Sequence, residues 1–134
     1  MHTDLQIERF LGGASYAVVG ASTDRSKYGN KVLRAYLQDD RCVFPVHPSA
    51  DEIEGLKAYP TLSDIPEPVH GVSIITPPNI TESIVAQAGV LKLKHLWIQP
   101  GAENDKALDA AYAHQMNVIA GGPCILVILG FREG

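Results

Sequence analysis

Five short apolar runs recur along the 134-residue chain, and most of them are separated by segments with helical periodicity. The runs span 16–20, 42–46, 71–75, 95–98 and 117–120. Strands that are apolar almost throughout are buried on both faces, which is typical of parallel strands joined by helices. The sequence therefore predicts an α/β fold: a three-layer, Rossmann-like doubly wound sheet of about five mainly parallel strands with helices on both faces.

Length, composition and charge limit the class of protein. We expect one domain over residues 1–134, because a chain of this length buries one core and leaves little room for a second. No apolar run approaches the roughly 20 residues that span a bilayer, and the N-terminus lacks the pattern of a signal peptide. We therefore expect a cytoplasmic protein without a membrane partner. The formal net charge of −4 argues against a nucleic-acid partner, and a homodimer is compatible with the sequence.

The sequence contains no clear catalytic or metal-binding pattern. The two cysteines, Cys42 and Cys124, form no CxxC motif and no cluster with histidine. We expect two thiols rather than a disulfide framework or a zinc site. No Ser/His/Asp order and no paired carboxylates fall convincingly at the ends of the expected strands. These patterns therefore identify neither catalytic residues nor a metal site.

Local signals add three structural expectations. The helix after the first run should bury an apolar stripe and expose Lys31, Arg34 and Gln38. The helix after the third run should begin with Asn79 as its N-cap, and Glu82 completes a capping box. Pro45 cannot donate to a ladder, so the second strand should be at an edge of the sheet, or its ladder should end there.

In an open sheet of this kind, ligands bind beyond the carboxyl ends of the strands, near the point where the strand order reverses. The segments that follow the five runs are GASTDRSKYGN, HPS, TPPN, QPGAE and GGPC. All five are rich in glycine, proline or small polar residues. We therefore expect a ligand site at this edge.

The first of these segments has the features of a phosphate-binding turn. The backbone N–H groups of Ala21 and Ser22, the Ser22 hydroxyl and the N-terminus of the next helix favour phosphate oxygens. Gly29 permits close approach of a phosphate or of backbone. Four basic residues within 25–34 add local positive charge to an acidic protein. The alternative is a solvated surface loop with ordinary lysines.

The same turn differs from the standard nucleotide-binding fingerprints. Gly20 and Gly29 lie nine positions apart, so the turn is longer than G-x-G-x-x-G, and the absence of GK[ST] excludes a Walker A loop. The end of the second run offers His47 and Ser49 but no acid for ribose hydroxyls, which disfavours NAD. A phosphate-bearing ribose suits His47 better, although a lone histidine in a turn is as often structural.

Two further segments offer rigid or small groups at this edge. Thr76-Pro77-Pro78 forms a donor-poor edge against which a flat ring or an apolar chain can lie. The alternative is that these prolines only end the strand and begin the next helix. Gln99-Pro100-Gly101 offers an amide and a glycine that admits close backbone approach, and a structural turn explains it equally well.

Together these segments resemble the CoA-binding domain family. Its members include small standalone proteins similar to the CoA-binding domain of the succinyl-CoA synthetase alpha subunit and of NDP-forming acyl-CoA synthetases. The resemblance covers about residues 5–130, and its motifs are VVGASTDRSKYGNKV, VFPVHP, IEGLKAYPTLSDIP, IITPPN and LWIQPGAEN. It departs at the C-terminal end, where many relatives carry Asp-Arg-Cys followed by acidic residues and this chain has GGPCILVILGF.

The resemblance implies that coenzyme A lies across the strand ends of a Rossmann fold. The first turn would meet the phosphates, and His47 and Pro48 would lie near the adenosine. The Thr76-Pro77-Pro78 segment would border the adenine or the start of the pantetheine arm, and Gln99 and Gly101 would line the far side. The binding residues it implies are Gly20, Ala21, Ser22, Arg25, Lys27, Tyr28, Gly29, Asn30, His47, Pro48, Thr76, Pro77, Pro78, Gln99 and Gly101.

Three functions remain open from the sequence. The first is non-catalytic binding of CoA or an acyl-CoA. The second is a small enzyme or an acyl-CoA synthetase component that uses His47 or Cys124 on a thioester, and the third is an NAD(P)-binding regulatory domain. Cys124 is either buried beneath the apolar run 125–129 or close enough to the pantetheine tip to form a mixed disulfide under oxidation.

Overall fold

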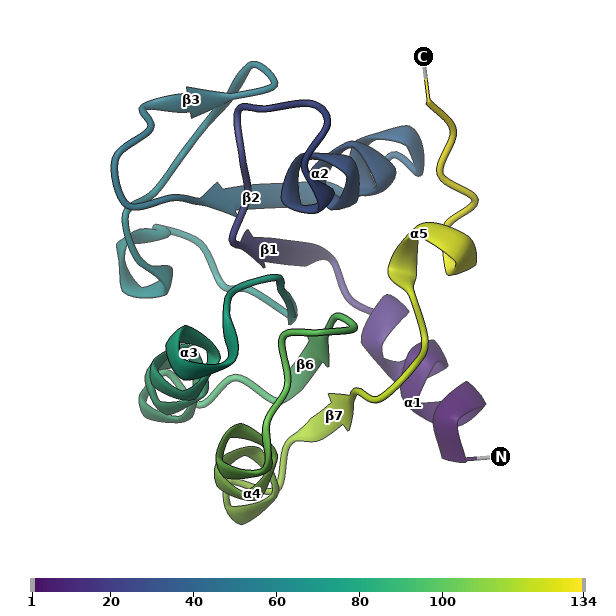
Figure 1. The fold of residues 1–134 in the computed structure, drawn as a ribbon, viewed down its shortest axis with the longest axis vertical. Coiled ribbons are helices and arrows are strands. Elements are labelled where there is room, and N and C mark those ends of the chain that lie inside the picture. The colour runs from purple at the N-terminus through teal and green to yellow at the C-terminus, as the bar shows by residue number, and fades with distance from the viewer. Residues whose placement is uncertain (1, 134) are drawn as a thin grey trace.

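The computed structural model of the protein describes residues 2–133. Its main sheet has five parallel strands in the order β2-β1-β5-β6-β7 (Figure 1). The strands are β1 (Ser15–Val19), β2 (Cys42–Val46), β5 (Gly71–Ile74), β6 (His95–Ile98) and β7 (Asn117–Ile119). The predicted α/β, Rossmann-like fold is confirmed, and each strand lies on one of the five apolar runs.

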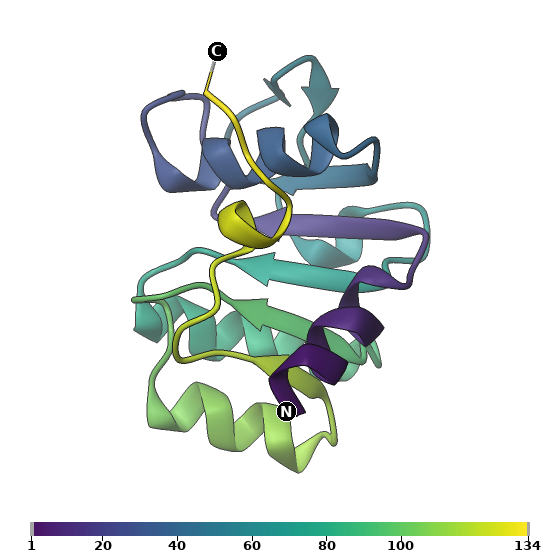
Figure 2. The same ribbon diagram turned by 90° about the vertical axis from the view of Figure 1, so that its right-hand side faces the viewer.

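Helices cover both faces of this sheet (Figures 1 and 2). On one face, α1, α2 and α5 pack over Tyr16 and Val18, and on the other, α3 and α4 pack over Ala17 and Val19. Successive β1 side chains alternate between the two faces, as the pleat requires. None of the helices in residues 2–133 is long and apolar enough to cross a membrane. The helices are α1 (His2–Leu11), α2 (Tyr28–Gln38), α3 (Pro78–Val90), α4 (Asp105–Ala113) and α5 (Ile125–Ile128).

The strand order reverses between β1 and β5. From β1 the chain moves outward to β2, then returns past β1 to β5 and continues to β7. The prediction that β2 is an edge strand is confirmed, and Pro45 pairs in register with Val18. The carboxyl ends of β1 and β5 therefore form the switch point at which open α/β sheets bind ligands.

The crossover from β2 to β5 carries a small hairpin of its own. Strands β3 (Glu52–Ile53) and β4 (Leu56–Lys57) pair antiparallel, and a short 3₁₀ helix, η1 (Leu62–Asp64), follows. An isolated parallel bridge between Val46 and Tyr59 fastens this segment beside the end of β2. The hairpin thus lies next to the ligand edge.

Two local expectations are wrong. Arg34 is only 6% exposed, although helical periodicity placed it on the solvent side of α2. Asn79 does not cap α3, which begins at Pro78 with Pro77 in the cap position. A proline at the first helical position lacks an N–H and has a preset φ, so it begins the helix without a side-chain cap. Glu82 instead accepts a hydrogen bond of 2.6 Å from the Asn104 side chain.

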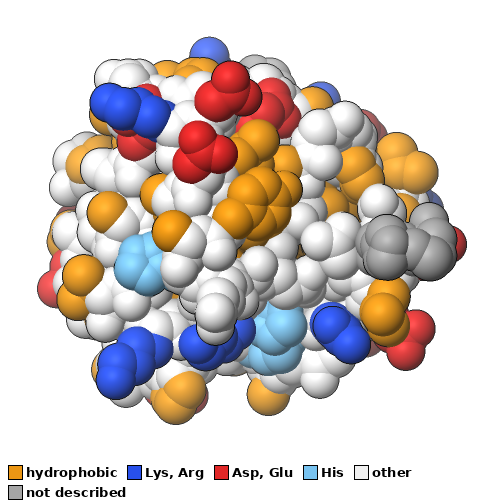
Figure 3. All heavy atoms as spheres, turned by 90° about the horizontal axis from the view of Figure 1, so that it is seen from below, with side chains coloured by type: hydrophobic (Ala, Val, Ile, Leu, Met, Phe, Trp, Pro, Cys, Tyr) orange, Lys and Arg blue, Asp and Glu red, His pale blue; other side chains and the backbone are white. Residues whose placement is uncertain are grey.

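The face drawn in Figure 3 carries acidic, basic, histidine and hydrophobic side chains. Apolar atoms are a normal part of any folded surface. Tyr112 on α4 is 58% exposed, which is an example of a large apolar side chain that the sheet does not cover.

Two histidine rings stack at the amino-terminal edge of the sheet, opposite the ligand edge. The His70 and His95 ring centroids lie 4.3 Å apart with an interplanar angle of 26°. The His95 Nδ1 atom lies 3.1 Å from the Asn117 amide nitrogen, which is a donor. Partial burial lowers the pKa of His95, and the nearby charges of His70 and Arg9 lower it further.

Acidification should therefore destabilise the fold through His95. In the unfolded chain its pKa returns to about 6.5, so from this pH downward the unfolded state binds the proton more readily than the folded state. The free energy of unfolding, measured with urea, should fall between about pH 7 and pH 5. His95→Gln should flatten this dependence, whereas His114→Gln, which removes an exposed histidine on α4's C-terminal end, should not. An identical pH slope in His95→Gln would contradict the assignment.

Candidate functional site

A cleft of about 580 Å³ opens at the carboxyl ends of the strands. Its walls come from the start of α2 and from the segments that follow β5, β6 and β7. Apolar or small groups make up most of this lining, which consists of Tyr28, Ile75, Thr76, Pro77, Pro100, Gly101, Ala102 and Cys124. The Thr76 hydroxyl is already hydrogen-bonded to Thr81 Oγ1 at 2.7 Å. Four residues expected at the ligand site, Tyr28, Thr76, Pro77 and Gly101, are thus brought together.

A hydrogen-bonded relay runs along one wall of the cleft. The Tyr28 hydroxyl lies 3.0 Å from Gln99 Oε1 and 2.7 Å from Cys124 Sγ. An amide oxygen only accepts, so Tyr28 donates its one proton to Gln99 and accepts from the Cys124 thiol. Burial raises the pKa of Tyr28, and the contact with Cys124 raises it further. The raised pKa therefore keeps the Tyr28 hydroxyl protonated at physiological pH.

Gln99 lies directly behind this wall and is fully buried. Its Oε1 atom also accepts the Ile125 N–H at 3.3 Å, which fixes the orientation of the amide. Among buried side-chain nitrogen and oxygen atoms in the described part of the chain, Gln99 Nε2 alone lacks a hydrogen-bond partner. Leaving a buried donor unpaired costs about 1–3 kcal/mol. Such an atom in a native fold requires an explanation, and a bound ligand or water is one.

The glycines of the first turn serve close backbone packing. Gly20 has a φ of +95°, and an added Cβ would lie 2.7 Å from the Ile75 carbonyl oxygen. An added Cβ on Gly29 would lie 1.9 Å from the Gly20 carbonyl oxygen. The space beside Gly29 is therefore filled by the chain's own backbone, which lets the first turn of α2 rest on the end of β1.

Asn30 and Arg34 hold the turn from behind. Asn30 is fully buried and donates to the Ser22 carbonyl at 2.8 Å, while its Oδ1 accepts from Arg34 Nε at 2.7 Å. Arg34 also donates to the Arg25 carbonyl at 2.8 Å. Two buried side chains thus fix two carbonyls of the loop between β1 and α2.

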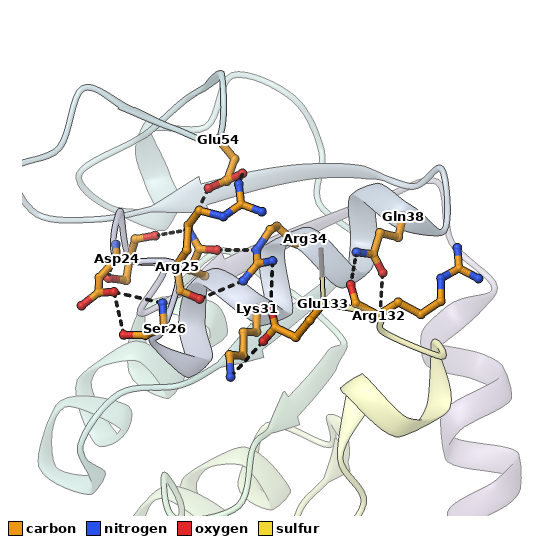
Figure 4. A network of polar contacts seen from close by, with 11 residues as sticks. Asp24, Arg25, Ser26, Lys31, Arg34, Gln38, Glu54, Arg132 and Glu133 are labelled. Carbon is orange, nitrogen blue, oxygen red and sulfur yellow. Dashed lines mark hydrogen bonds and ion pairs between the residues drawn. The ribbon is translucent and has the colours of Figure 1, made fainter.

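Three of the four basic residues of this loop and of α2 are paired with carboxylates from distant segments (Figure 4). Arg25 Nη1 lies 2.8 Å from Glu54 Oε1 at the tip of the β3–β4 hairpin. Lys31 and Arg34 contact the two oxygens of Glu133 at 3.1 and 3.3 Å. Neither glutamate was expected at this site from the sequence. The Glu54-Gly55 pair between two short apolar pieces is a weak hairpin signal, whereas nothing local signals the position of Glu133.

Other residues expected at the site lie outside the cleft. Lys27 is exposed just before α2, and Ala21 is buried in the loop. His47 follows β2, where its Nδ1 accepts the backbone N–H groups of Ser49 and Ala50 at 3.1 and 2.9 Å. This contact gives His47 a role in its own turn. Pro48 is exposed beside it, and Pro78 is the first residue of α3.

The parallel sheet, its two helical layers and the cleft at the switch point define a Rossmann-like α/β domain. A family model described as a CoA binding domain matches residues 14–130. The chain belongs to this CoA-binding domain family.

Curated relatives are much longer than this chain. The ADP-forming acetate–CoA ligase II of Archaeoglobus fulgidus is 30% identical over 132 residues, which cover 90% of this chain and 19% of the ligase. The alpha subunit of the ADP-forming acetate–CoA ligase II of Pyrococcus furiosus is 26% identical, and the match covers 89% of this chain and 28% of that subunit. The chain is therefore related to one part of acyl-CoA synthetases.

Solved structures include both small and large proteins with this fold. A conserved hypothetical protein of Pyrococcus furiosus is 34% identical with a TM-score of 0.81, and the match covers 87% of this chain and 99% of that protein. The dinucleotide-forming acetyl-coenzyme A synthetase 1 of Ca. Korarchaeum cryptofilum, solved with phosphate and ADP, is 31% identical with a TM-score of 0.76. That match covers 85% of this chain and 27% of the synthetase.

Proposed function

We propose that this protein binds coenzyme A or an acyl-CoA across the carboxyl ends of its strands without chemistry of its own. The observation that carries the proposal is the cleft beside Tyr28 and Cys124, together with the unpaired amide nitrogen of Gln99 behind its wall. Membership of a CoA-binding family gives the class of ligand.

The residues at this edge fit the parts of coenzyme A by their chemistry. The turn after β1 offers backbone N–H groups together with Arg25 and Lys27, which suit phosphate oxygens. The cleft, with proline, alanine and isoleucine in its walls, suits the flexible pantetheine arm. The Gln99 amide suits a carbonyl acceptor on that arm, provided that Tyr28 moves aside. Cys124 lies at the same cleft, where the thiol end of the ligand would arrive.

A synthetase component is the second candidate function. The relatives that favour it are acyl-CoA ligases in which the matching segment is about a fifth of the length. In that case the domain would hold the CoA that another domain or subunit acylates. The relay gives no ready nucleophile for such a step, because Cys124 donates its proton to Tyr28 and Tyr28 donates to Gln99.

A melting experiment with a panel of ligands tests the binding proposal. CoA at ten times its Kd should add about 1.4 kcal/mol to the stability, because only the native state binds it. For a protein of this size the melting temperature should rise by roughly 5 °C. NAD, NADP and ATP at the same concentration should raise it less. An unmoved melting temperature with saturating CoA, alongside a rise with NAD, would reject CoA and favour the NAD(P)-binding alternative.

Incubation with acetyl-CoA tests the absence of chemistry. The thioester should persist at the rate of its spontaneous hydrolysis, measured by release of free thiol. Faster release that Cys124→Ala abolishes would favour the enzyme.

A further inference from the structure

The tip of the β3–β4 hairpin carries Glu54, which contacts the loop between β1 and α2 and has an unfavourable backbone conformation. Its two-residue loop, Glu54 and Gly55, joins Ile53 to Leu56, which pair with each other. Both loop residues have a positive φ, 52° at Glu54 and 78° at Gly55, as a type I′ turn requires. Asparagine, aspartate and glycine are preferred at the first position, because other side chains carry a steric cost there. The geometry of the turn therefore does not explain why a glutamate occupies position 54.

The Glu54 side chain makes its contacts on the loop between β1 and α2 and on the first turn of α2 (Figure 4). Its Oε1 accepts from Arg25 Nη1 at 2.8 Å, and its Oε2 accepts from Asn30 Nδ2 at 3.1 Å. The same Asn30 nitrogen donates to the Ser22 carbonyl. The side chain of Glu54 is only 18% exposed. Both carboxylate oxygens are thus held by donors that belong to the expected phosphate-binding turn.

We propose that Glu54 is an affinity-determining residue of the ligand site. Its carboxylate occupies the place on Arg25 and Asn30 that a phosphate group of the ligand takes on binding, and the hairpin tip then withdraws. This inference rests on the proposed binding of CoA. A guanidinium recognises carboxylate and phosphate oxygens with the same paired donors, and two anions on one guanidinium repel each other. The chain's own acid is therefore a built-in competitor of the ligand.

The charges of the ligand phosphate and of the Glu54 carboxylate decide which of them binds Arg25. A phosphate monoester, such as the 3′-phosphate of CoA, carries about −1.5 to −2 charges near neutral pH, whereas a carboxylate carries one. A phosphate therefore displaces Glu54 but gives up part of its binding energy to do so.

Replacing Glu54 with glutamine removes the competing charge and keeps an acceptor for Arg25 or Asn30. At low ionic strength, CoA should bind Glu54→Gln about five- to tenfold more tightly than the wild type, the size expected for one charged contact. Isothermal titration calorimetry with CoA and with dephospho-CoA measures the gain. A gain for CoA alone assigns the 3′-phosphate to this position, and an equal gain for both assigns the pyrophosphate.

Two matched variants separate direct competition from net charge. Glu133→Gln removes a carboxylate of the same network that contacts Lys31 and Arg34 instead of the loop, and should give a smaller gain. Glu67→Gln removes an exposed carboxylate near the amino ends of the strands and should give none. Equal gains for Glu54→Gln and Glu133→Gln would overturn the inference, as would unchanged or weaker CoA binding by Glu54→Gln. Absence of CoA binding in the wild type and all three variants would instead reject the proposed function, and the inference with it.

Discussion

Replacing Gly29 with alanine should lower the free energy of unfolding by about 3 kcal/mol, measured by urea denaturation. The added Cβ would lie 1.9 Å from the Gly20 carbonyl oxygen and 3.3 Å from the Ala21 Cα. These are backbone atoms, so rotation of a side chain cannot relieve the overlap. Helix α2 would have to move away from β1, and the buried Val32 and Leu33 would lose their close packing against the sheet.

Gly122→Ala is the matched control for this substitution. An added Cβ there meets no atom within 4 Å, and Gly122 does not have a positive φ. Its free energy of unfolding should stay within about 0.5 kcal/mol of the wild type. If Gly29→Ala were equally mild, the contact between α2 and the end of β1 would be adaptable and the packing argument would be wrong.

The fold followed from the sequence because burial on both faces leaves a strong local signal. A central parallel strand needs apolar side chains at nearly every position, so β1 and β6 appear as uninterrupted runs. Pro45 added the edge position of β2, because a proline cannot donate to a second neighbour. The location of the ligand edge then follows from the rule for open α/β sheets, whereas the order of the strands comes from the structure.

The charges of the site could not be predicted in the same way. Helical periodicity treats a charged residue such as Arg34 as exposed, yet its burial depends on the segment 130–133, which is almost a hundred positions further along the chain. There Phe131 lies under the Arg34 guanidinium at 5.2 Å from its ring centroid, and Glu133 pairs with it. Gln38 fastens the same segment through two hydrogen bonds with the Arg132 backbone. No local pattern encodes such contacts.

The cleft was likewise predictable only in part: its turns could be found from the sequence, but the contacts between them could not. The sequence predicted which turns meet at the ligand edge. Four residues of those turns line the cleft: Tyr28, Thr76, Pro77 and Gly101. The Gln99 side chain has two partners from distant segments, Tyr28 and Ile125, and both bind its oxygen. The unpaired amide nitrogen therefore emerges only from the assembled structure. The expectation that Cys124 is either buried or at the ligand resolves into a half-buried thiol that lines the cleft.

Replacing Arg25 and Lys27 together with alanine should weaken CoA binding by about 30-fold, or about 2 kcal/mol, at low ionic strength. Both cations of the loop are removed, and the Glu54 carboxylate keeps only the neutral Asn30 as a partner, so its charge faces the phosphates directly. The dependence of affinity on salt should also become shallower, because salt screens attraction between charges.

The double variant Lys92→Ala/Lys94→Ala removes the same charge from two exposed positions just before β6, at the opposite edge of the sheet. This control should bind CoA with the affinity of the wild type and with the same dependence on salt, as measured by titration calorimetry at two salt concentrations. A general effect of net charge would weaken both double variants alike. If the Arg25/Lys27 variant kept the wild-type affinity, the loop would be an ordinary solvated surface, and the phosphates of the ligand would have to bind through backbone N–H groups alone.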